Sequence, residues 1–303
     1  SYNMSSALEY YIPGYSESSY PMIVGLILAV GTGLIIFGGV HRIGFITSVM
    51  VPIMAGAYLL MGLFTIVTHL PQLPGIFAMI LSEAFDFQAI FGGMAGSAVV
   101  IGIKRGLFSN EAGMGSAPNA AASASVSHPA KQGMVQVISV FIDTLLICSA
   151  TAMMLLLSGV QGEAGVLDGI PFVQKAISAN VGTWGIHFIT ASIFAFAFSS
   201  LIGNYYYAES NILFIKNNKV LLFVFRCTCL LAVFLGAQAD FSLVWNLADI
   251  TMGCMAIVNI IAILLLGNIA LKVLKDYETQ KKAGKNPVFK AENVGIKNTD
   301  CWK

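Results

Sequence analysis

Seven stretches of this sequence are long and apolar enough to cross, or nearly cross, a lipid bilayer. A bilayer core of about 30 Å takes about 20 mostly apolar residues in an α-helix. The stretches occupy residues 21–40, 47–69, 88–104, 134–158, 186–215, 220–237 and 242–271. Only 10% of the 303 residues are charged, against about a quarter in soluble domains, so a soluble protein of this size could not cover its surface. We therefore predict an all-α, polytopic membrane protein with about seven transmembrane helices.

The basic residues indicate the orientation of these spans, because cytoplasmic connections carry an excess of Lys and Arg. If residues 1–20 lie outside the cell, only Lys175 of the 16 Lys and Arg residues falls on the outer side. Arg226 lies one or two turns into the sixth span, and we expect its side chain to extend to the inner face. The prediction is a multi-pass protein of the cell membrane, with the N-terminal end of this chain outside and the C-terminus in the cytoplasm.

The hydropathy pattern predicts a membrane domain, residues 1–273, and a polar cytoplasmic tail, residues 274–303, which we expect to be partly disordered. Two outer connections, residues 70–87 and 160–185, contain apolar segments too short to span the bilayer. Two placements are open for these segments: the membrane surface, or an outer vestibule.

The third span is rich in small residues, among them Gly93, Gly96 and Ser97. One interpretation is structural, because small residues allow two helices to approach closely. The other is functional: a helix that loosens here frees backbone groups to bind an ion or the charged ends of a substrate. The residues themselves leave both interpretations open.

The fifth span carries a polar stripe. Ser200, Asn204 and Tyr207 follow one another at i, i+4 and i+7 and so share one helix face, with Ser199 beside it. Hydroxyl and carbonyl oxygens suit a hard monovalent cation, and an Asn side chain offers a donor and an acceptor to a zwitterion. The alternative is that the Ser hydroxyls bond to carbonyls of their own helix.

Two acidic residues lie at membrane depth: Asp143 in the fourth span and Asp249 in the seventh, where Trp245 precedes Asp249 by about one turn. An ionisable residue inside a membrane is by default a candidate for proton transfer or cation binding. A structural hydrogen bond to a neighbouring helix is an equally open explanation for each acid.

Several other classes of site are disfavoured. Residues 105–122 are rich in glycine, but no Gly-Lys-Ser/Thr follows and no strand precedes them, so they are not a phosphate-binding loop. The four histidines form no HExxH motif, and no histidine pairs with an acid at helical spacing within a span, which disfavours a metal site and an enzyme. The five cysteines show no metal spacing and are expected to be free thiols. A net charge of +1 provides no field that would attract nucleic acid.

The segment GLFSNEAGMGSAPNAAA, residues 106–122, resembles the alanine/glycine:cation symporter family, also described as sodium:alanine symporters. Supporting stretches follow in the family's order along nearly the whole chain. They are FGGVHRI (37–43), HPAKQG (128–133), VFIDTLLICSATA (140–152), FAFSSLIGNYYYAE (196–209), LVWNLADI (243–250) and MAIVN (255–259).

The resemblance implies a LeuT-like fold, built from two inverted five-helix repeats around a site at the membrane midplane. Residues 1–69 would hold the end of the first repeat and residues 88–273 the second. The family's N-terminal GTGN-type segment has no match here. We therefore expect this chain to be the C-terminal part of a family member, with the first three core helices missing.

The resemblance also implies sodium-coupled transport of alanine, glycine or a similar small neutral amino acid, with Na⁺ as the coupling ion and no other cofactor. Ser199 and Ser200 fall where the eighth core helix of that fold binds sodium. The residues expected to contact substrate are Gly93, Gly96, Ser97, Asn204 and Tyr207. Those expected to serve as gating or structural polar groups are Asn110, Glu111, Asp143, Trp245 and Asp249.

Two alternatives keep the same fold. A proton-coupled symporter would titrate Asp143 or Asp249 instead of binding sodium. A channel or non-transporting sensor would use the same helices without coupled uptake.

Overall fold

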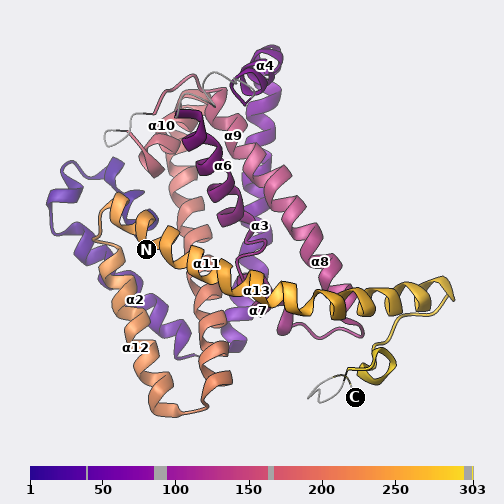
Figure 1. Cartoon of the computed structure of the whole chain (residues 1–303). Helices are drawn as coiled ribbons and strands as arrows, with labels where there is room; N and C mark the ends of the chain where they lie inside the picture. Colours follow the sequence, from indigo (N-terminus) through magenta and orange to yellow (C-terminus); the bar gives the residue numbers. More distant parts are fainter. Residues whose placement is uncertain (39, 85–93, 163–166, 297–301, 303) are drawn as a thin grey trace. The chain divides into compact units, whose positions relative to one another are not determined.

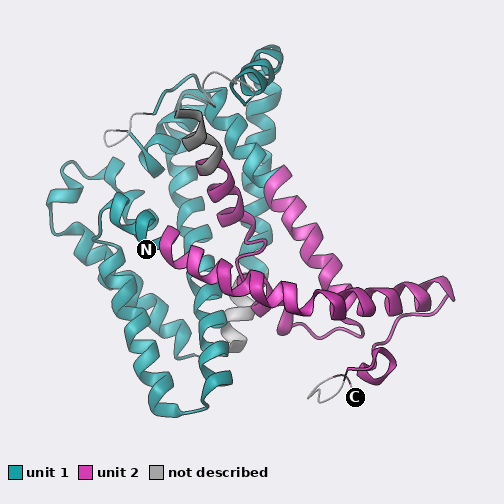
Figure 2. Ribbon diagram, viewed as in Figure 1, with its two compact units in different colours: residues 1–99, 146–248 teal, residues 100–145, 249–303 magenta. Residues whose placement is uncertain are grey.

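The computed structural model describes residues 1–38, 40–84, 94–162, 167–296 and 302, which form helices joined by short connections (Figure 1). The chain divides into two compact units: one holds Ser1–Val99 and Leu146–Ala248, and the other Val100–Leu145 and Asp249–Lys303 (Figure 2). The first division falls inside helix α6 (Met94–Asn110), and the last inside helix α13 (Phe241–Lys282). We describe each unit by itself.

The first unit consists of long apolar helices and shorter segments between them. Its helices are α1 (Tyr2–Ser6), α2 (Tyr20–Ile36), α3 (Val40–Thr68), α4 (Leu73–Ala84), α9 (Ser149–Leu156), α10 (Gly169–Val181), α11 (Trp184–Ile215) and α12 (Lys219–Gly236). Helix α11 contacts α3, α10 and α12, and α12 packs along α2. Asn218 begins α12 as its N-cap, since its Oδ1 accepts a hydrogen bond from the Val220 N–H at 2.8 Å.

Small residues set the closest helix contacts in this unit. A Cβ atom on Gly25 of α2 would lie 2.8 Å from the Phe234 carbonyl oxygen of α12. A Cβ atom on Gly62 of α3 would lie 2.8 Å from the Ala150 Cβ of α9. Both distances are too short for a real side chain, so glycine is what lets these backbones approach.

The second unit contains the C-terminal half of α6, α7 (Ser116–Ala122), α8 (Pro129–Phe141) and most of α13. A π-helical turn, Ile142–Cys148, links α8 to α9 and straddles the division between the units. Such turns replace the regular i→i−4 bonds with wider ones and are frequent at functional sites.

Five helices of the described residues are long and apolar enough to cross a membrane: Val49–Thr68, Pro129–Leu156, Trp184–Ile215, Lys219–Gly236 and Phe241–Lys282. They coincide with five of the predicted spans. Residues Tyr20–Ile36, a sixth, form a shorter apolar helix. The remaining predicted span, 88–104, lies partly outside the described residues and is helical from Met94. The protein is therefore all-α and multi-pass.

The outer connection at residues 160–185 contains helix α10, which packs on α9 and α11. Its Gln174, Ala176 and Ile177 are buried. Helix α10 therefore contributes to the core of the first unit, and the two placements relative to the membrane stay predictions. The other connection contains α4, whose described residues include none that is buried.

Helix α13 continues to Lys282, past the predicted domain boundary at residue 273. At about 1.5 Å per residue its 42 residues extend about 63 Å, roughly twice the hydrocarbon thickness. Residues after α13 make defined contacts with the start of α8. The Phe289 N–H donates to the Ser127 carbonyl at 2.9 Å, and Lys131 Nζ donates to Asn286 Oδ1 at 2.7 Å.

Candidate functional site

The polar stripe of the fifth span lies on helix α11, in the first unit. Ser200 and Asn204 are exposed, and Ser199 and Tyr207 are half-buried. The Ser199 hydroxyl donates to the Phe196 carbonyl at 2.9 Å, which is the bond that the helix-bonded alternative expects, and its oxygen keeps lone pairs that can bind a cation. For Ser200 and Asn204, the contacts of the described part of the chain include no side-chain hydrogen bond.

The face of α11 behind this stripe is packed. Ile202, Tyr205 and Glu209 are buried there. At about 100° per residue, Tyr205 and Glu209 lie on the side of the helix opposite Ser200. The packed face contacts Ile36 of α2 and Leu230 of α12. The stripe is thus an oxygen-bearing surface on a helix whose opposite face packs against α2 and α12.

The other predicted substrate contacts are only partly described. Gly93 lies outside the described residues. Gly96 and Ser97 lie in α6, in the stretch whose side chains are not described. Trp245 lies in α13, where its ring meets that of Phe241 at a centroid distance of 6.0 Å.

The second unit brings together four of the predicted gating residues. The Ser109 hydroxyl donates to Asp143 Oδ2 at 2.7 Å, and Asn110 Nδ2 donates to Thr144 Oγ1 at 3.1 Å. These two bonds join the C-terminal end of α6 to the first turn of the π-helical segment. They correspond to the structural alternative for Asp143, and they place it beside the segment that resembles the family most closely.

Asp249 is held by two cations. Arg105 Nη2 lies 2.9 Å from each carboxylate oxygen, and Lys104 Nζ lies 3.6 Å from Oδ2. The side chain of Asp249 is 20% exposed and that of Arg105 is 37% exposed. This charge-assisted contact ties α6 to α13 and is the stronger kind of hydrogen bond.

The turn after α6 is fixed against α13. Glu111 has φ 55°, a left-handed conformation that is uncommon outside glycine, and Gly115 follows at φ 103°. Asn259 Nδ2 donates to the Gly113 carbonyl at 2.9 Å. A Cβ on Gly115 would lie 3.2 Å from the Asn259 Cβ. Asn259 was not among the predicted site residues, although its place at membrane depth was a usable signal.

An ion pair between a buried acid on α11 and a half-buried Arg on α12 was also missed. Arg226 Nη2 donates to Glu209 Oε1 at 2.8 Å, and Arg226 Nε donates to the Tyr205 hydroxyl at 2.9 Å. The guanidinium of Arg226 thus lies against the neighbouring helix α11, and its extension to the inner face stays a prediction. The signal in the sequence was an acid late in one span and an Arg early in the next.

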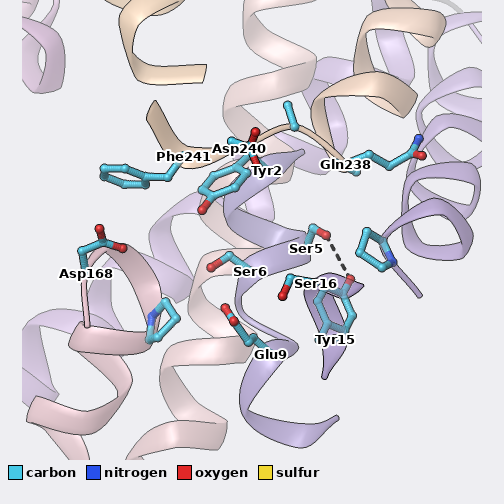
Figure 3. A pocket seen from close by; sticks show the side chains of 14 residues that line it. Tyr2, Ser5, Ser6, Glu9, Tyr15, Ser16, Asp168, Gln238, Asp240 and Phe241 are labelled. Atoms are coloured by element: carbon cyan, nitrogen blue, oxygen red, sulfur yellow. Dashed lines mark hydrogen bonds between the residues drawn. The ribbon is translucent and has the colours of Figure 1, made fainter. Parts of the chain in front are cut away.

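A polar cavity of about 260 Å³ lies in the first unit, between α1, the start of α10 and the connection after α12 (Figure 3). Three carboxylates and several hydroxyls line it, and none of its described lining residues is basic. Ser5 and Tyr15 are hydrogen-bonded at its wall at 2.9 Å. Burial, with Asp168, Glu9 and Asp240 adding to it, raises the pKa of the Tyr2 hydroxyl. None of the predicted site residues lines this cavity.

Comparisons with known proteins show the family of this chain. Residues 1–291 match the sodium:alanine symporter family. The chain is 48% identical to the amino-acid carrier protein AlsT of Bacillus subtilis over 283 residues, which is 93% of this chain and 60% of AlsT. It is 47% identical to the probable sodium/glutamine symporter GlnT of Bacillus subtilis, covering 93% of this chain and 59% of GlnT.

A more distant relative is the sodium/alanine symporter AgcS of Methanococcus maripaludis, 37% identical over 88% of this chain and 59% of AgcS. The chain thus spans about three fifths of the length of these relatives, all of which are named as carriers or symporters. A family match along almost the whole sequence leaves no doubt about kinship: the chain belongs to the sodium:alanine symporter family.

Proposed function

We propose that this chain forms the greater part of a sodium-coupled symporter for alanine, glycine or a similar small neutral amino acid. The family membership and the names of the relatives support the reaction class. The observation that carries the assignment of a site is the exposed stripe of Ser200 and Asn204 on α11, on a helix whose opposite face is packed. An oxygen-bearing surface at membrane depth is costly unless it faces protein, water or a ligand.

In this proposal Ser199 and Ser200 bind sodium, and Asn204 and Tyr207 contact the amino acid. Gly93, Gly96 and Ser97 complete the substrate contacts from the sixth core helix of a LeuT-like fold. Residues 1–69 end the first repeat, residues 88–273 form the second, and residues 274–303 are a cytoplasmic tail. The first three core helices lie outside this chain, the N-terminal end of the chain faces outward, and the C-terminus faces the cytoplasm.

Sodium entry drives accumulation. One charge that moves through 100 mV supplies about 2.3 kcal/mol, which is about fifty-fold in concentration. Sodium binding raises the affinity for the amino acid, and by reciprocity the amino acid raises the affinity for sodium by the same factor. Transport then proceeds by alternating access, as helix bundles rock around a fixed site.

The polar contacts of the second unit act as the inner gate. Asn110 ends α6 and Glu111 begins the turn that Asn259 holds, and Asp143 accepts a hydrogen bond from the Ser109 hydroxyl. Asp249 pairs with Arg105 and Lys104. For the inner gate to open, the bonds from Arg105 and Lys104 to Asp249 must either break or move as one group. We therefore assign Asp249 to gating.

Proton coupling is the second candidate. A relative from Bacillus strain PS3, 38% identical, is named as a sodium/proton-dependent alanine carrier. In this alternative Asp143 or Asp249 carries the titrating proton. Uptake that persists without sodium and collapses with a protonophore would favour it.

Uptake of labelled alanine into proteoliposomes tests the proposed function. The chain is compared alone and extended, by the part of AlsT that it does not cover, to the length of that relative. We expect sodium-dependent uptake by the extended protein only. Uptake of neither alanine nor glycine by the extended protein contradicts the proposed function. Uptake by the chain alone contradicts the assignment of three necessary core helices to the remaining part.

A further inference from the structure

Arg226 joins three helical segments of the first unit through one guanidinium group. It donates to Glu209 and Tyr205 of α11 from its place in α12. Its guanidinium carbon also lies 5.3 Å from the ring centroid of Phe37, the residue that follows α2. Bonds from Nε and Nη2 fix the plane of the group as well as its distance, which a Lys ammonium could not do.

Helix packing alone does not require this ion pair. The same region holds an apolar cluster of Ile36, Ile202 and Tyr205, with Phe225 and Leu230 packed against it. Glu209 is only 6% exposed, and removing a carboxylate and a guanidinium from water often costs more than their attraction returns. What the pair adds is a defined register between α11 and α12, because the apolar contacts alone tolerate sliding and rotation.

The pair lies directly behind one end of the polar stripe. Asn204 precedes Tyr205, and Tyr207 lies between Tyr205 and Glu209 along the helix. Ser200 is nine residues from Glu209, about 13.5 Å along the axis at 1.5 Å per residue, whereas Asn204 is about 7.5 Å away. A shift of α11 at Glu209 therefore displaces the Asn204 end of the stripe more than the Ser200 end.

We propose that Glu209, Arg226 and Tyr205 form a positioning cluster that sets the amino-acid end of the α11 stripe, and so the affinity for substrate more than for sodium. The consequence for transport rests on the proposed function. The claim that the cluster sets the position of Asn204 on α11 does not depend on the proposed function. Two readouts are therefore needed, one of transport and one of position.

The first readout is transport kinetics of the extended protein in proteoliposomes. The double variant Glu209→Gln/Arg226→Gln removes both charges, so no buried charge is left unpaired and the protein has the best chance to fold. We expect the KM for alanine to rise about tenfold, with the sodium concentration for half-maximal uptake changed less than about threefold. The KM of Arg226→Lys should lie between that of the unsubstituted protein and that of the double variant. The charge swap Glu209→Arg/Arg226→Glu should recover part of the affinity for alanine.

Tyr58→Phe is the matched control. It removes another interhelical hydrogen bond of the first unit, from the Tyr58 hydroxyl to Thr151 Oγ1 at 2.9 Å, and keeps the ring. We expect the KM for alanine and the sodium concentration for half-maximal uptake to stay unchanged in this variant. A purely structural role for the cluster predicts instead a loss of folded protein or of maximal rate, with both constants unaltered or raised together, and that result overturns the proposal.

The second readout is independent of transport. In a background without the five native cysteines, Asn204→Cys and Ser200→Cys report the position of each site through their rates of reaction with a maleimide. The Glu209→Gln/Arg226→Gln change should alter the rate at residue 204 severalfold and leave residue 200 nearly unchanged. Equal effects at both sites, or none, overturn the positioning. The unsubstituted extended protein could take up no alanine while the labelling rates still change more at residue 204 than at residue 200. That result contradicts only the proposed function and leaves the positioning intact.

Discussion

His128 is predicted to hold the C-terminal segment onto the start of α8, and its loss should release that segment. Its side chain is fully buried. Nδ1 accepts the Ala130 N–H at 3.1 Å and so caps α8, which leaves Nε2 to carry the proton and donate to Asp276 Oδ2 at 3.2 Å. The rings of Tyr277 and Phe289 meet the imidazole edge-on at 5.1 and 5.2 Å.

The magnitude follows from these contacts. Loss of a helix cap costs about 1 kcal/mol, a hydrogen bond to a charged group about 1.5–3 kcal/mol, and each aromatic contact about 0.5–1.5 kcal/mol. In His128→Ala, Asp276 still accepts the hydrogen bond from Gln280 Nε2 at 2.8 Å, which reduces the free energy lost. We expect His128→Ala to weaken the docked segment by about 3 kcal/mol at least, which is about a hundredfold in its opening equilibrium.

Amide hydrogen exchange measures this directly, because the Phe289 N–H is bonded to the Ser127 carbonyl. Exchange at Phe289 should accelerate about a hundredfold in His128→Ala, and less in His128→Asn, which retains an acceptor for the Ala130 N–H. His69→Ala, in the first unit, should leave this exchange unchanged. A change below about threefold in His128→Ala, or an equal change in the His69 variant, refutes the reasoning.

Four further predictions follow from single contacts. Asp249→Asn should lower the free energy of unfolding by about 2 kcal/mol, which is less than the full cost of breaking a buried ion pair because Arg105 is partly exposed. Thermal unfolding in detergent measures this loss, and an unchanged stability contradicts the gating contact. Gly115→Ala should destabilise the turn after α6, through its positive φ and the 3.2 Å approach to Asn259, whereas Gly106→Ala, where a Cβ meets open space, should not. Because burial raises the pKa of Tyr2 above 10, its stabilising contribution is complete below pH 10 and is lost as the pH rises through the folded value; Tyr2→Phe should reduce the alkaline loss of stability, and identical pH curves would contradict this. Asn218→Ala should cost about 1 kcal/mol through its lost cap on α12, without a change in uptake.

Helix positions in this protein follow from hydropathy because a bilayer admits few alternatives to apolar helices. The predicted span at 186–215 and helix α11 (Trp184–Ile215) coincide for that reason. The same rule does not determine where α13 ends, since nothing in hydropathy stops a polar helix that continues beyond the membrane to Lys282. Nor does it anticipate that Phe289 returns to Ser127, because that contact depends on the path of the chain.

The candidate site was predictable where spacing within one helix decides it. The stripe of Ser200, Asn204 and Tyr207 needs only the helical period. Contacts between helices need the rotation of each helix about its own axis, which the sequence alone does not give. The partners of Arg226 and Asp249 were missed for this reason, although both residues had been singled out.

The most direct test of the central claim is the sodium dependence of alanine uptake by the extended protein carrying Ser200→Ala. Ser210→Ala is the matched control, because that hydroxyl lies on the same helix and donates to the Tyr206 carbonyl at 2.9 Å. If the α11 stripe binds the coupling ion, the sodium concentration for half-maximal uptake rises at least about tenfold in Ser200→Ala and stays unchanged in Ser210→Ala. An unaltered sodium dependence in Ser200→Ala contradicts the claim.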